Sequence, residues 1–252
     1  MKKLVIFLFM FLLIGSSTAF GGEALYFVDK VYSTDRMEEA LGYELFDLSV
    51  TSTDSPDEFS TLMTVGEWDL VVCACQWDSG ISSFVTFENT GIEDYVNEGG
   101  KAIFCDWVTD GDTEFYNFFG ATTTGNENET SMTVASGDLA EGLASNPQIL
   151  TNSSWGGIIF SVGLSPLTSE DIEVATFDNG DAAIIISNGG RTIINGFLTD
   201  TLSDDILIRN EIELLLSPTT EENDSGGCNI AAFSGIGFLL LVPLMFLSGR
   251  RK

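Results

Sequence analysis

The fold is decided by one stretch of the sequence, Tyr95-Val96-Asn97-Glu98-Gly99-Gly100-Lys101-Ala102-Ile103-Phe104. A helix over residues 87–98 is expected to end at the two glycines, because glycine adopts the left-handed backbone conformation of a helix end without steric cost. The apolar run that follows, residues 101–107, has the length of a buried strand. A helix that leads through Gly-Gly into such a strand predicts an α/β domain.

The same alternation of strand and helix continues upstream. Strands are expected at residues 24–29, 46–50 and 68–76, and helices at residues 34–45 and 56–65. The third of these strands is apolar on both faces, as a central parallel strand should be. Ser55 and Pro56 fit the N-cap and the first position of the second helix. Four βα units in series favour a parallel sheet with helices on both faces.

Downstream of residue 120 the pattern changes to short strands and turns. Residues 130–135 are a candidate edge strand, and residues 148–160 are expected to be short strand and turn. Three strands are then expected at residues 173–177, 182–187 and 191–197, because Asn179-Gly180 and Gly189-Gly190 are strong hairpin signals between apolar runs. A helix over residues 204–216 closes the predicted domain.

Taken in order, these segments resemble the class I glutamine amidotransferase-like, flavodoxin-like superfamily, in particular its non-amidotransferase branches. The resemblance rests on residues 95–104, Val174-Ala175-Thr176-Phe177, Ala182-Ala183-Ile184-Ile185-Ile186 and Gly190-Arg191-Thr192-Ile193-Ile194-Asn195-Gly196-Phe197. It spans most of residues 24–216 and implies a flavodoxin-like parallel sheet with flanking helices and an antiparallel C-terminal extension.

The activity of the family's amidotransferases is not expected here. Those enzymes carry a cysteine in a Gly-x-Cys-x-Gly turn and a histidine further along the chain. In this sequence Phe104-Cys105-Asp106-Trp107 lacks both glycines, and the chain contains no histidine. The lack of histidine also excludes serine or cysteine hydrolases with a histidine base, and histidine-ligated zinc or haem sites.

Both ends of the chain carry targeting patterns. Lys2 and Lys3 precede the apolar residues 4–14 and the small residues 15–19, which predicts a secretory signal peptide, residues 1–19, cleaved after Ala19. The apolar run is about half the roughly 20 residues of a spanning helix, and an uncleaved N-terminal anchor is the alternative. Residues 230–247 are mostly apolar and uncharged and are followed by the basic residues 248–252, a pattern typical of a transmembrane helix with a cytoplasmic end.

A polar linker, residues 217–229, joins the domain of residues 20–216 to this helix and contains Ser225-Gly226-Gly227-Cys228-Asn229. Motif, helix and basic end resemble the Synerg-CTERM type of bacterial protein-sorting tail. The resemblance implies a processing enzyme that acts at Gly226, Gly227 and Cys228, with the protein anchored to the membrane at least until processing. The alternative is an ordinary single-pass anchor with a cysteine beside the membrane. Either way the domain is expected to be exported to the cell envelope or cell surface.

The domain between the two ends is strongly acidic. With the linker included, residues 20–229 contain only five basic residues against 38 acidic ones, which gives a formal charge of about −33. The basic residues are Lys30, Arg36, Lys101, Arg191 and Arg209. Such a surface repels nucleic acid, so nucleic-acid binding is excluded as a function.

Ligands of open parallel sheets bind beyond the carboxyl ends of the strands. The candidate ligand-binding residues there are Asp29, Gln76, Trp77, Asp78, Asp106 and Trp107, with Asp200 after the last strand. Two tryptophans among carboxylates suit a sugar ring or a cationic ligand. The alternative is that these are loop residues of an acidic protein with ordinary aromatic packing.

One acidic loop is a candidate metal site. Asp106, Asp110, Asp112 and Glu114 supply oxygen ligands of the kind that calcium prefers, although their spacing does not match an EF-hand. No other cofactor is predicted.

Three cysteines lie in the domain. Cys73 and Cys75 are two residues apart in one strand and should face the same side of the sheet, with Cys105 on the neighbouring strand. Buried thiols, a disulfide that includes Cys105 and a reactive thiolate are the three interpretations.

The function that these patterns favour is a non-catalytic binding or structural module of the cell envelope, with an unknown extracellular ligand. The alternative is a secreted hydrolase of glycans, which would use two carboxylates among Asp29, Asp78, Asp106 and Asp110, because that chemistry needs no histidine.

Overall fold

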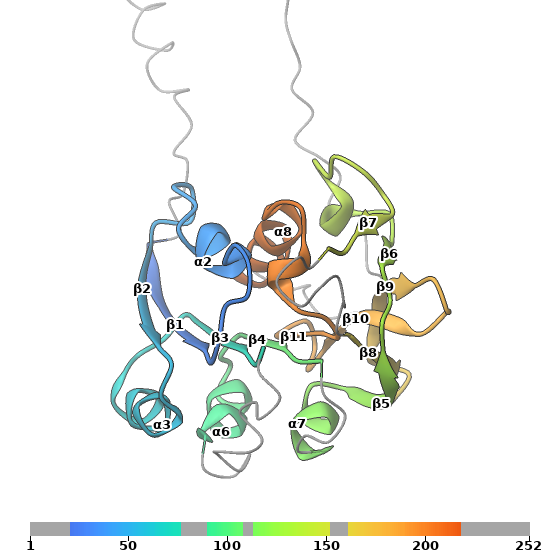
Figure 1. Ribbon diagram of the computed structural model, residues 1–252. Helices are drawn as coiled ribbons and strands as arrows, with labels where there is room; N and C mark the ends of the chain where they lie inside the picture. The colour runs from blue at the N-terminus through green and yellow to red at the C-terminus, as the bar shows by residue number, and fades with distance from the viewer. Residues whose placement is uncertain (1–20, 77–89, 108–112, 152–160, 218–252) are drawn as a thin grey trace, which may run out of the picture. The chain divides into compact units, whose positions relative to one another are not determined.

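The computed structural model describes residues 21–76, 90–107, 113–151 and 161–217. These residues form one mixed sheet of 11 strands in the order β2-β1-β3-β4-β11-β10-β9-β6-β7, with β5 and β8 paired beside β10 (Figure 1). The predicted signal peptide, sorting motif, transmembrane helix and basic end lie outside the described residues. Among the described helices none is long and apolar enough to cross a membrane.

The parallel half of the sheet follows the prediction. Its strands are β1 (Gly22–Val28), β2 (Leu48–Thr53), β3 (Leu70–Ala74), β4 (Ala102–Cys105) and β11 (Thr192–Asn195), and all four pairings between them are parallel. Every residue of β3 is buried, as its apolar sequence predicted. Strand β1 lies between β2 and β3, so the order of connections reverses between β1 and β3. Such a reversal is where ligands of these folds usually bind.

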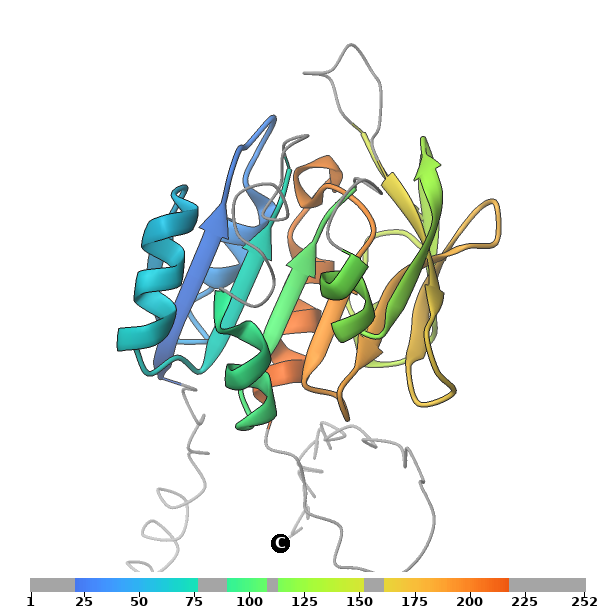
Figure 2. The same cartoon turned by 90° about the horizontal axis from the view of Figure 1, so that it is seen from below.

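Helices cover both faces of this half (Figure 2). Helices α2 (Arg36–Leu41) and α8 (Ile206–Leu216) pack together on one face, and α3 (Pro56–Val65), α6 (Ile92–Asn97) and α7 (Thr113–Phe118) cover the other. The predicted cap of α3 is confirmed, because the Ser55 side chain accepts a hydrogen bond from Glu58 N at 3.3 Å and Pro56 begins the helix.

Three of the helices differ from the prediction. Helix α6 begins at Ile92, because Gly91 before it has a φ of +76° and is not helical, whereas the predicted helix spans residues 87–98. Helix α2 ends at Leu41 rather than at residue 45, because Gly42 caps it and its N–H bonds to Glu38 O. Helix α7 was not predicted. It is only six residues long, and its sequence Thr-Glu-Phe-Tyr-Asn-Phe gives little helical periodicity.

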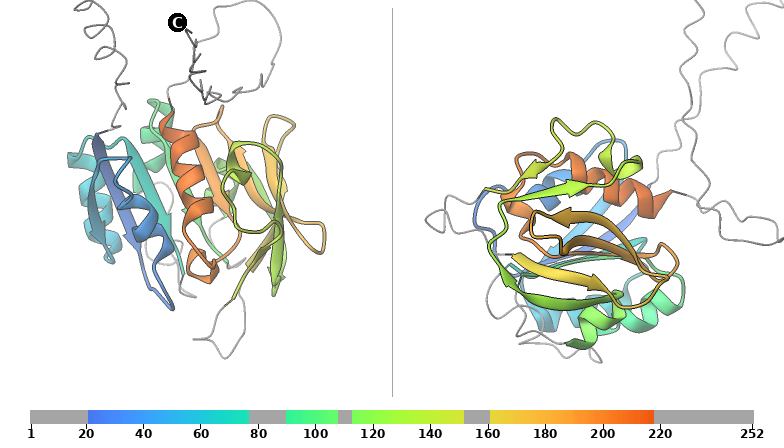
Figure 3. Two further views of the ribbon diagram at one scale, coloured as in Figure 1. Left: turned by 90° about the horizontal axis from the view of Figure 1, so that it is seen from above. Right: turned by 90° about the vertical axis from the view of Figure 1, so that its right-hand side faces the viewer.

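The antiparallel half contains β5 (Ala121–Glu127), β6 (Ser131–Val134), β7 (Gln148–Ile149), β8 (Ser161–Pro166), β9 (Ile172–Phe177) and β10 (Ala182–Ser187). The predicted hairpin turns are confirmed by the positive φ of Gly180, Gly189 and Gly190. The prediction of β6 as an edge strand is wrong, because β6 lies between β9 and the short β7. Strands β5 and β8 were not predicted, and they pair with each other at this end of the sheet (Figure 3).

Candidate functional site

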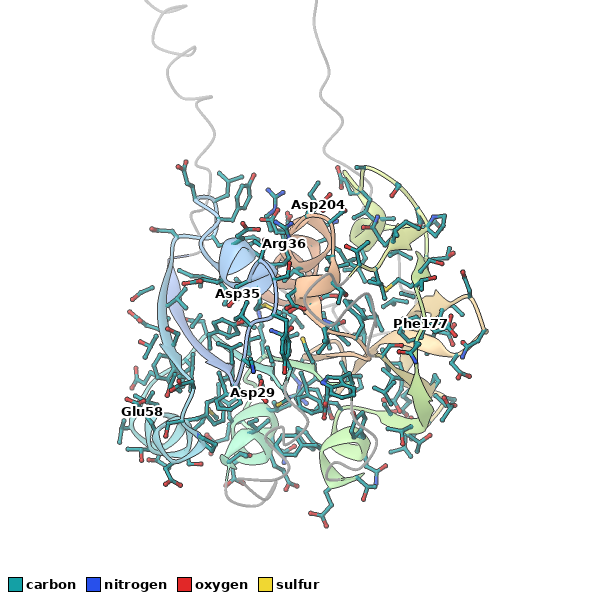
Figure 4. All side chains as sticks on the ribbon, in the orientation of Figure 1. Asp29, Asp35, Arg36, Glu58, Phe177 and Asp204 are labelled. Atoms are coloured by element: carbon teal, nitrogen blue, oxygen red, sulfur yellow. The ribbon has the colours of Figure 1, made fainter. Side chains whose placement is uncertain are left out.

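The carboxyl ends of β1, β3 and β4 bring four of the six predicted ligand-binding residues together. Asp29, labelled in Figure 4, follows β1. Gln76 follows β3, and Asp106 and Trp107 follow β4. Trp77 and Asp78 lie outside the described residues. The four described residues form the group that is called the carboxyl-edge cluster below.

Asp29 and Gln76 connect β1 to β3 at the point where the order of connections reverses. Asp29 Oδ1 accepts a hydrogen bond from Gln76 N at 2.7 Å, and Gln76 Nε2 donates to Lys30 O at 3.0 Å. The Gln76 side chain has no exposed surface. The Asp29 carboxylate therefore holds the backbone at the end of β3, and Gln76 holds the loop that follows β1.

Asp106 and Trp107 extend the same chain of hydrogen bonds to β4. Asp106 N donates to Asn195 O at 3.1 Å, and Asp106 Oδ1 accepts from Trp107 N at 2.7 Å. The half-buried Trp107 ring donates through Nε1 to Gln76 O at 3.1 Å. The Trp107 residue is thus held by two hydrogen bonds, one from its backbone nitrogen and one from its indole nitrogen. The orientation of the ring is therefore set before any ligand binds.

A third acidic residue of this edge, Asp200, holds the loop after β1 from the other side. It lies in the 3-10 turn Thr199–Thr201, is 3% exposed, and its Oδ2 accepts hydrogen bonds from Tyr32 N at 2.8 Å and Ser33 N at 2.9 Å. Burial raises the pKa of Asp200 above its usual value, and the nearby Asp35 adds to the rise, whereas the two backbone N–H groups oppose it. The main effect of the carboxylate is to fix the loop.

Sequence reasoning missed Asp35, which follows the loop that Asp200 holds. Asp35 caps α2 by accepting from Glu38 N at 2.9 Å, and it also accepts from the Tyr26 hydroxyl at 2.9 Å (Figure 4). Burial and the Asp35 charge raise the pKa of Tyr26, so Tyr26 stays a neutral donor. Arg36 ties the same segment to the end of the sheet through Leu202 O and Ser203 O.

The predicted calcium loop is described in part. Asp106 is buried and bonded to its neighbouring backbone, Glu114 is exposed at the start of α7, and Asp110 and Asp112 lie outside the described residues. In the described ranges no three histidine, cysteine, aspartate or glutamate side chains gather closely enough to hold a metal ion. Calcium binding by this loop stays a prediction.

The three thiols are buried and none of them forms a disulfide in the described part of the chain, which confirms the first of their interpretations. Cys73 and Cys75 face the α3 side of the sheet, whereas Cys105 faces the α8 side, so the disulfide interpretation is wrong. Burial raises the pKa of Cys73 and of Cys105, and the Glu211 carboxyl adds to the rise at Cys105. A reactive thiolate at Cys105 is therefore not favoured.

A hollow in the described part lies at the opposite edge of the sheet. It has a volume of about 740 Å³ and is lined by Trp68, Asp69, Tyr95 and Lys101 among others. Several of these groups serve the fold: Asp69 accepts from Glu23 N at 2.9 Å, and the Tyr95 hydroxyl reaches Trp68 O and Lys101 O at 3.2 Å. We place the candidate site at the carboxyl edge because its position follows from the strand connections.

No protein-family model and no curated protein matches the chain. Solved structures do. A glutamine amidotransferase from Thermotoga maritima superposes with a TM-score of 0.53 at 12% identity, over 79% of this chain and 99% of that one. A protein assigned as a GMP synthase subunit, from Thermoplasma acidophilum, gives 0.50 at 14% identity, over 78% and 95%. The chain has the class I glutamine amidotransferase-like, flavodoxin-like fold.

A ThuA-like protein from Parabacteroides merdae superposes equally well, with a TM-score of 0.50 at 11% identity over 78% of this chain and 90% of that one. Identities this low establish a shared fold alone. The fold prediction is thus confirmed for the α/β domain, and the function has to be argued from the residues of this chain.

Proposed function

We propose that this chain is an exported, non-catalytic binding or structural module of the cell envelope, with its ligand site at the carboxyl-edge cluster. One observation supports the non-catalytic reading above all. The carboxylates of Asp29 and Asp200 accept hydrogen bonds from backbone N–H groups of other segments, and that of Asp106 accepts one from the backbone N–H of Trp107, the next residue. A carboxylate used in this way stabilises the edge, whereas an acid or base must reach its substrate.

Trp107 is the residue that we propose as the platform for the ligand. Its ring is held through Nε1 and its backbone through Asp106, so little rotamer entropy would be lost on binding. An aromatic ring beside acidic groups suits the apolar face of a sugar or a cationic group. The charge of about −33 on residues 20–229 disfavours anionic ligands.

Binding to insoluble polysaccharides tests this proposal. The full-length protein is mixed with chitin, cellulose, xylan or peptidoglycan, and the bound fraction and released reducing sugar are both measured. We expect retention on at least one polymer without sugar release, and loss of retention in Trp107→Ala. Val65→Ala, at an exposed position at the end of α3, is the matched control and should bind normally.

The same assay also tests the alternative that the protein is a glycan hydrolase. Sugar released by the unaltered protein and abolished in Asp78→Asn or Asp106→Asn would overturn the binding-module proposal. If the protein is neither retained on any polymer nor releases sugar from one, the sugar-binding part of the proposal is wrong. The structural role is then the part that remains.

Export and membrane sorting are proposed on sequence features alone. The support is the basic and apolar start of the chain, and the Gly226-Gly227-Cys228 motif before an apolar segment with a basic end. Mass spectrometry of the protein from its native host should find a mature N-terminus at Phe20 and a C-terminus near Gly227 or Cys228. If the mature protein still carries residues 250–252, the tail is an ordinary membrane anchor and the sorting proposal is wrong.

A further inference from the structure

A buried polar cluster lies beneath the carboxyl edge, between the sheet and α8. Asn195 ends β11, Cys105 lies beside it in register at the end of β4, and Glu211 comes from α8. All three side chains are buried, and Glu211 has no exposed surface. A carboxyl group in such a place needs hydrogen-bond partners, because its charged form loses its hydration on burial.

Only half of the hydrogen-bonding capacity of this cluster is filled. Asn195 Nδ2 donates to Glu211 Oε2 at 2.9 Å and lies 3.5 Å from Cys105 Sγ. Asn195 Oδ1 and Glu211 Oε1 are both buried and have no hydrogen-bond partner among the described residues. Two such oxygens cannot bond to each other while the carboxyl group is ionised, because both then only accept.

We propose that Glu211 carries a proton in the folded protein and forms a cyclic acid–amide pair with Asn195 that locks α8 onto β11. In this pair Glu211 Oε1–H donates to Asn195 Oδ1, and Asn195 Nδ2 donates to Glu211 Oε2. One proton thus gives both unpartnered oxygens a partner. Its loss to solvent at alkaline pH breaks the first bond and leaves a negative charge in the core.

The surroundings of Glu211 favour the neutral acid. The buried side chains around α8 are mainly apolar and include Met37, Ala40, Leu41 and Leu139, and the buried titratable groups among them are Cys105 and Tyr26. Helix α2 and the 3-10 turn Asp138–Ala140, which pack against α8, also carry charged groups, but Glu38, Glu39 and Asp138 are exposed and Arg36 is half-buried. On α8 itself, Arg209 pairs with Asp205 at 3.1 Å and lies over the Tyr43 ring. Burial raises the pKa of Glu211 to about 8, although the hydrogen bond from Asn195 lowers it somewhat.

The sign of the pH effect follows from this rise. The ordinary pKa of 4.5 applies to the unfolded chain, so the folded protein binds one more proton than the unfolded chain between about pH 4.5 and pH 8. The contribution of the pair to stability is complete below that window and is lost as the pH rises through it. One bound proton changes the unfolding equilibrium constant on the order of tenfold per pH unit within the window.

Two measurements on the full-length protein test the lock. The first is the infrared carbonyl band of a protonated carboxyl group, which should be present at pH 7, disappear by about pH 10 as the acid ionises, and be absent in Glu211→Gln. Asp200→Asn should keep the band, which separates Glu211 from Asp200, the other described carboxyl group whose pKa is raised by burial. Absence of the band from the unaltered protein at pH 7 would overturn the proposal.

The second measurement is urea unfolding at about pH 5, at the lower end of the window in which one extra proton is bound, and at about pH 9, above that window. Between these values the unfolding constant of the unaltered protein should rise at least about tenfold more than that of Glu211→Gln, because an amide keeps the pair without a titrating proton. Glu213→Gln removes an exposed carboxylate from the same helix and should behave like the unaltered protein. Equal pH dependence in all three proteins would contradict the lock, and if Glu211→Gln does not fold, the infrared band of Asp200→Asn decides.

Discussion

The two faces of the sheet bury different kinds of side chain. Against α3, α6 and α7 the sheet packs aromatic rings, with Phe27 against Phe59 at 5.7 Å and Phe104 against Phe115 at 5.2 Å between centroids. The face toward α2 and α8 contains the Tyr26 hydroxyl and the polar cluster around Glu211. Because side chains alternate along a strand, one sheet separates two layers. The first is stabilised by apolar packing, and the stability of the second depends on the proton that we propose on Glu211.

The largest effect is expected on the aromatic face. Phe104 contacts Phe115, Tyr116 and Phe119, with ring centroids 5.2 to 5.8 Å apart. Phe104→Ala should therefore lower the free energy of unfolding by about 3–5 kcal/mol, because it removes a buried ring and leaves a cavity. Urea unfolding measures this loss, which should be the same at pH 5 and at pH 8 if this face is independent of the proton. A loss that varies with pH would show that the two faces are not separate.

A smaller effect is expected from Asn195→Leu on the opposite face. The substitution leaves the buried Glu211 carboxyl without its amide partner, which should cost about 1–3 kcal/mol at pH 5. The measurement is again urea unfolding, with the exposed Glu213→Gln as the reference. A variant as stable as the unaltered protein would mean that the amide does not hold α8.

The smallest effect on the free energy of unfolding is expected from the N-cap of α3, a helix on the aromatic face. Ser55→Ala removes the hydrogen bond to Glu58 N and should cost about 1 kcal/mol. Asp35→Ala, which removes the corresponding cap on the other face and the partner of Tyr26 as well, should cost more. The two variants are compared by thermal unfolding, and an equal loss would indicate that the bond to Tyr26 adds nothing.

The sequence predicted the parts of the fold that local rules determine. Strand β3 was recognisable because all its residues are apolar, α3 because of its serine cap and proline, and the hairpins because Gly180 and Gly189 need positive φ. Strands β5 and β8 were missed because their threonines, serines and glycines form a strand only by pairing with each other. Such pairing depends on contacts between distant residues.

The candidate site could likewise be predicted only in part. The positions of Asp29, Gln76, Asp106 and Trp107 at one edge followed from the common direction of parallel strands. Their hydrogen bonds to neighbouring backbone did not, because these depend on loop conformation. Glu211 did carry a signal in the sequence: it stands four residues from both Leu207 and Leu215, on the buried side of α8. An acid in an apolar helical stripe is the pattern that could have revealed the pair with Asn195.

The central claim is that the carboxylates of the carboxyl edge hold backbone and do no chemistry. Urea unfolding of Asp200→Ala tests it most directly, because this carboxylate accepts from both Tyr32 N and Ser33 N. We predict a loss of about 1.5–3 kcal/mol in the free energy of unfolding, the usual contribution of hydrogen bonds to a charged group. Residues kept for catalysis often destabilise the fold, so an unchanged or higher stability of Asp200→Ala would contradict the account.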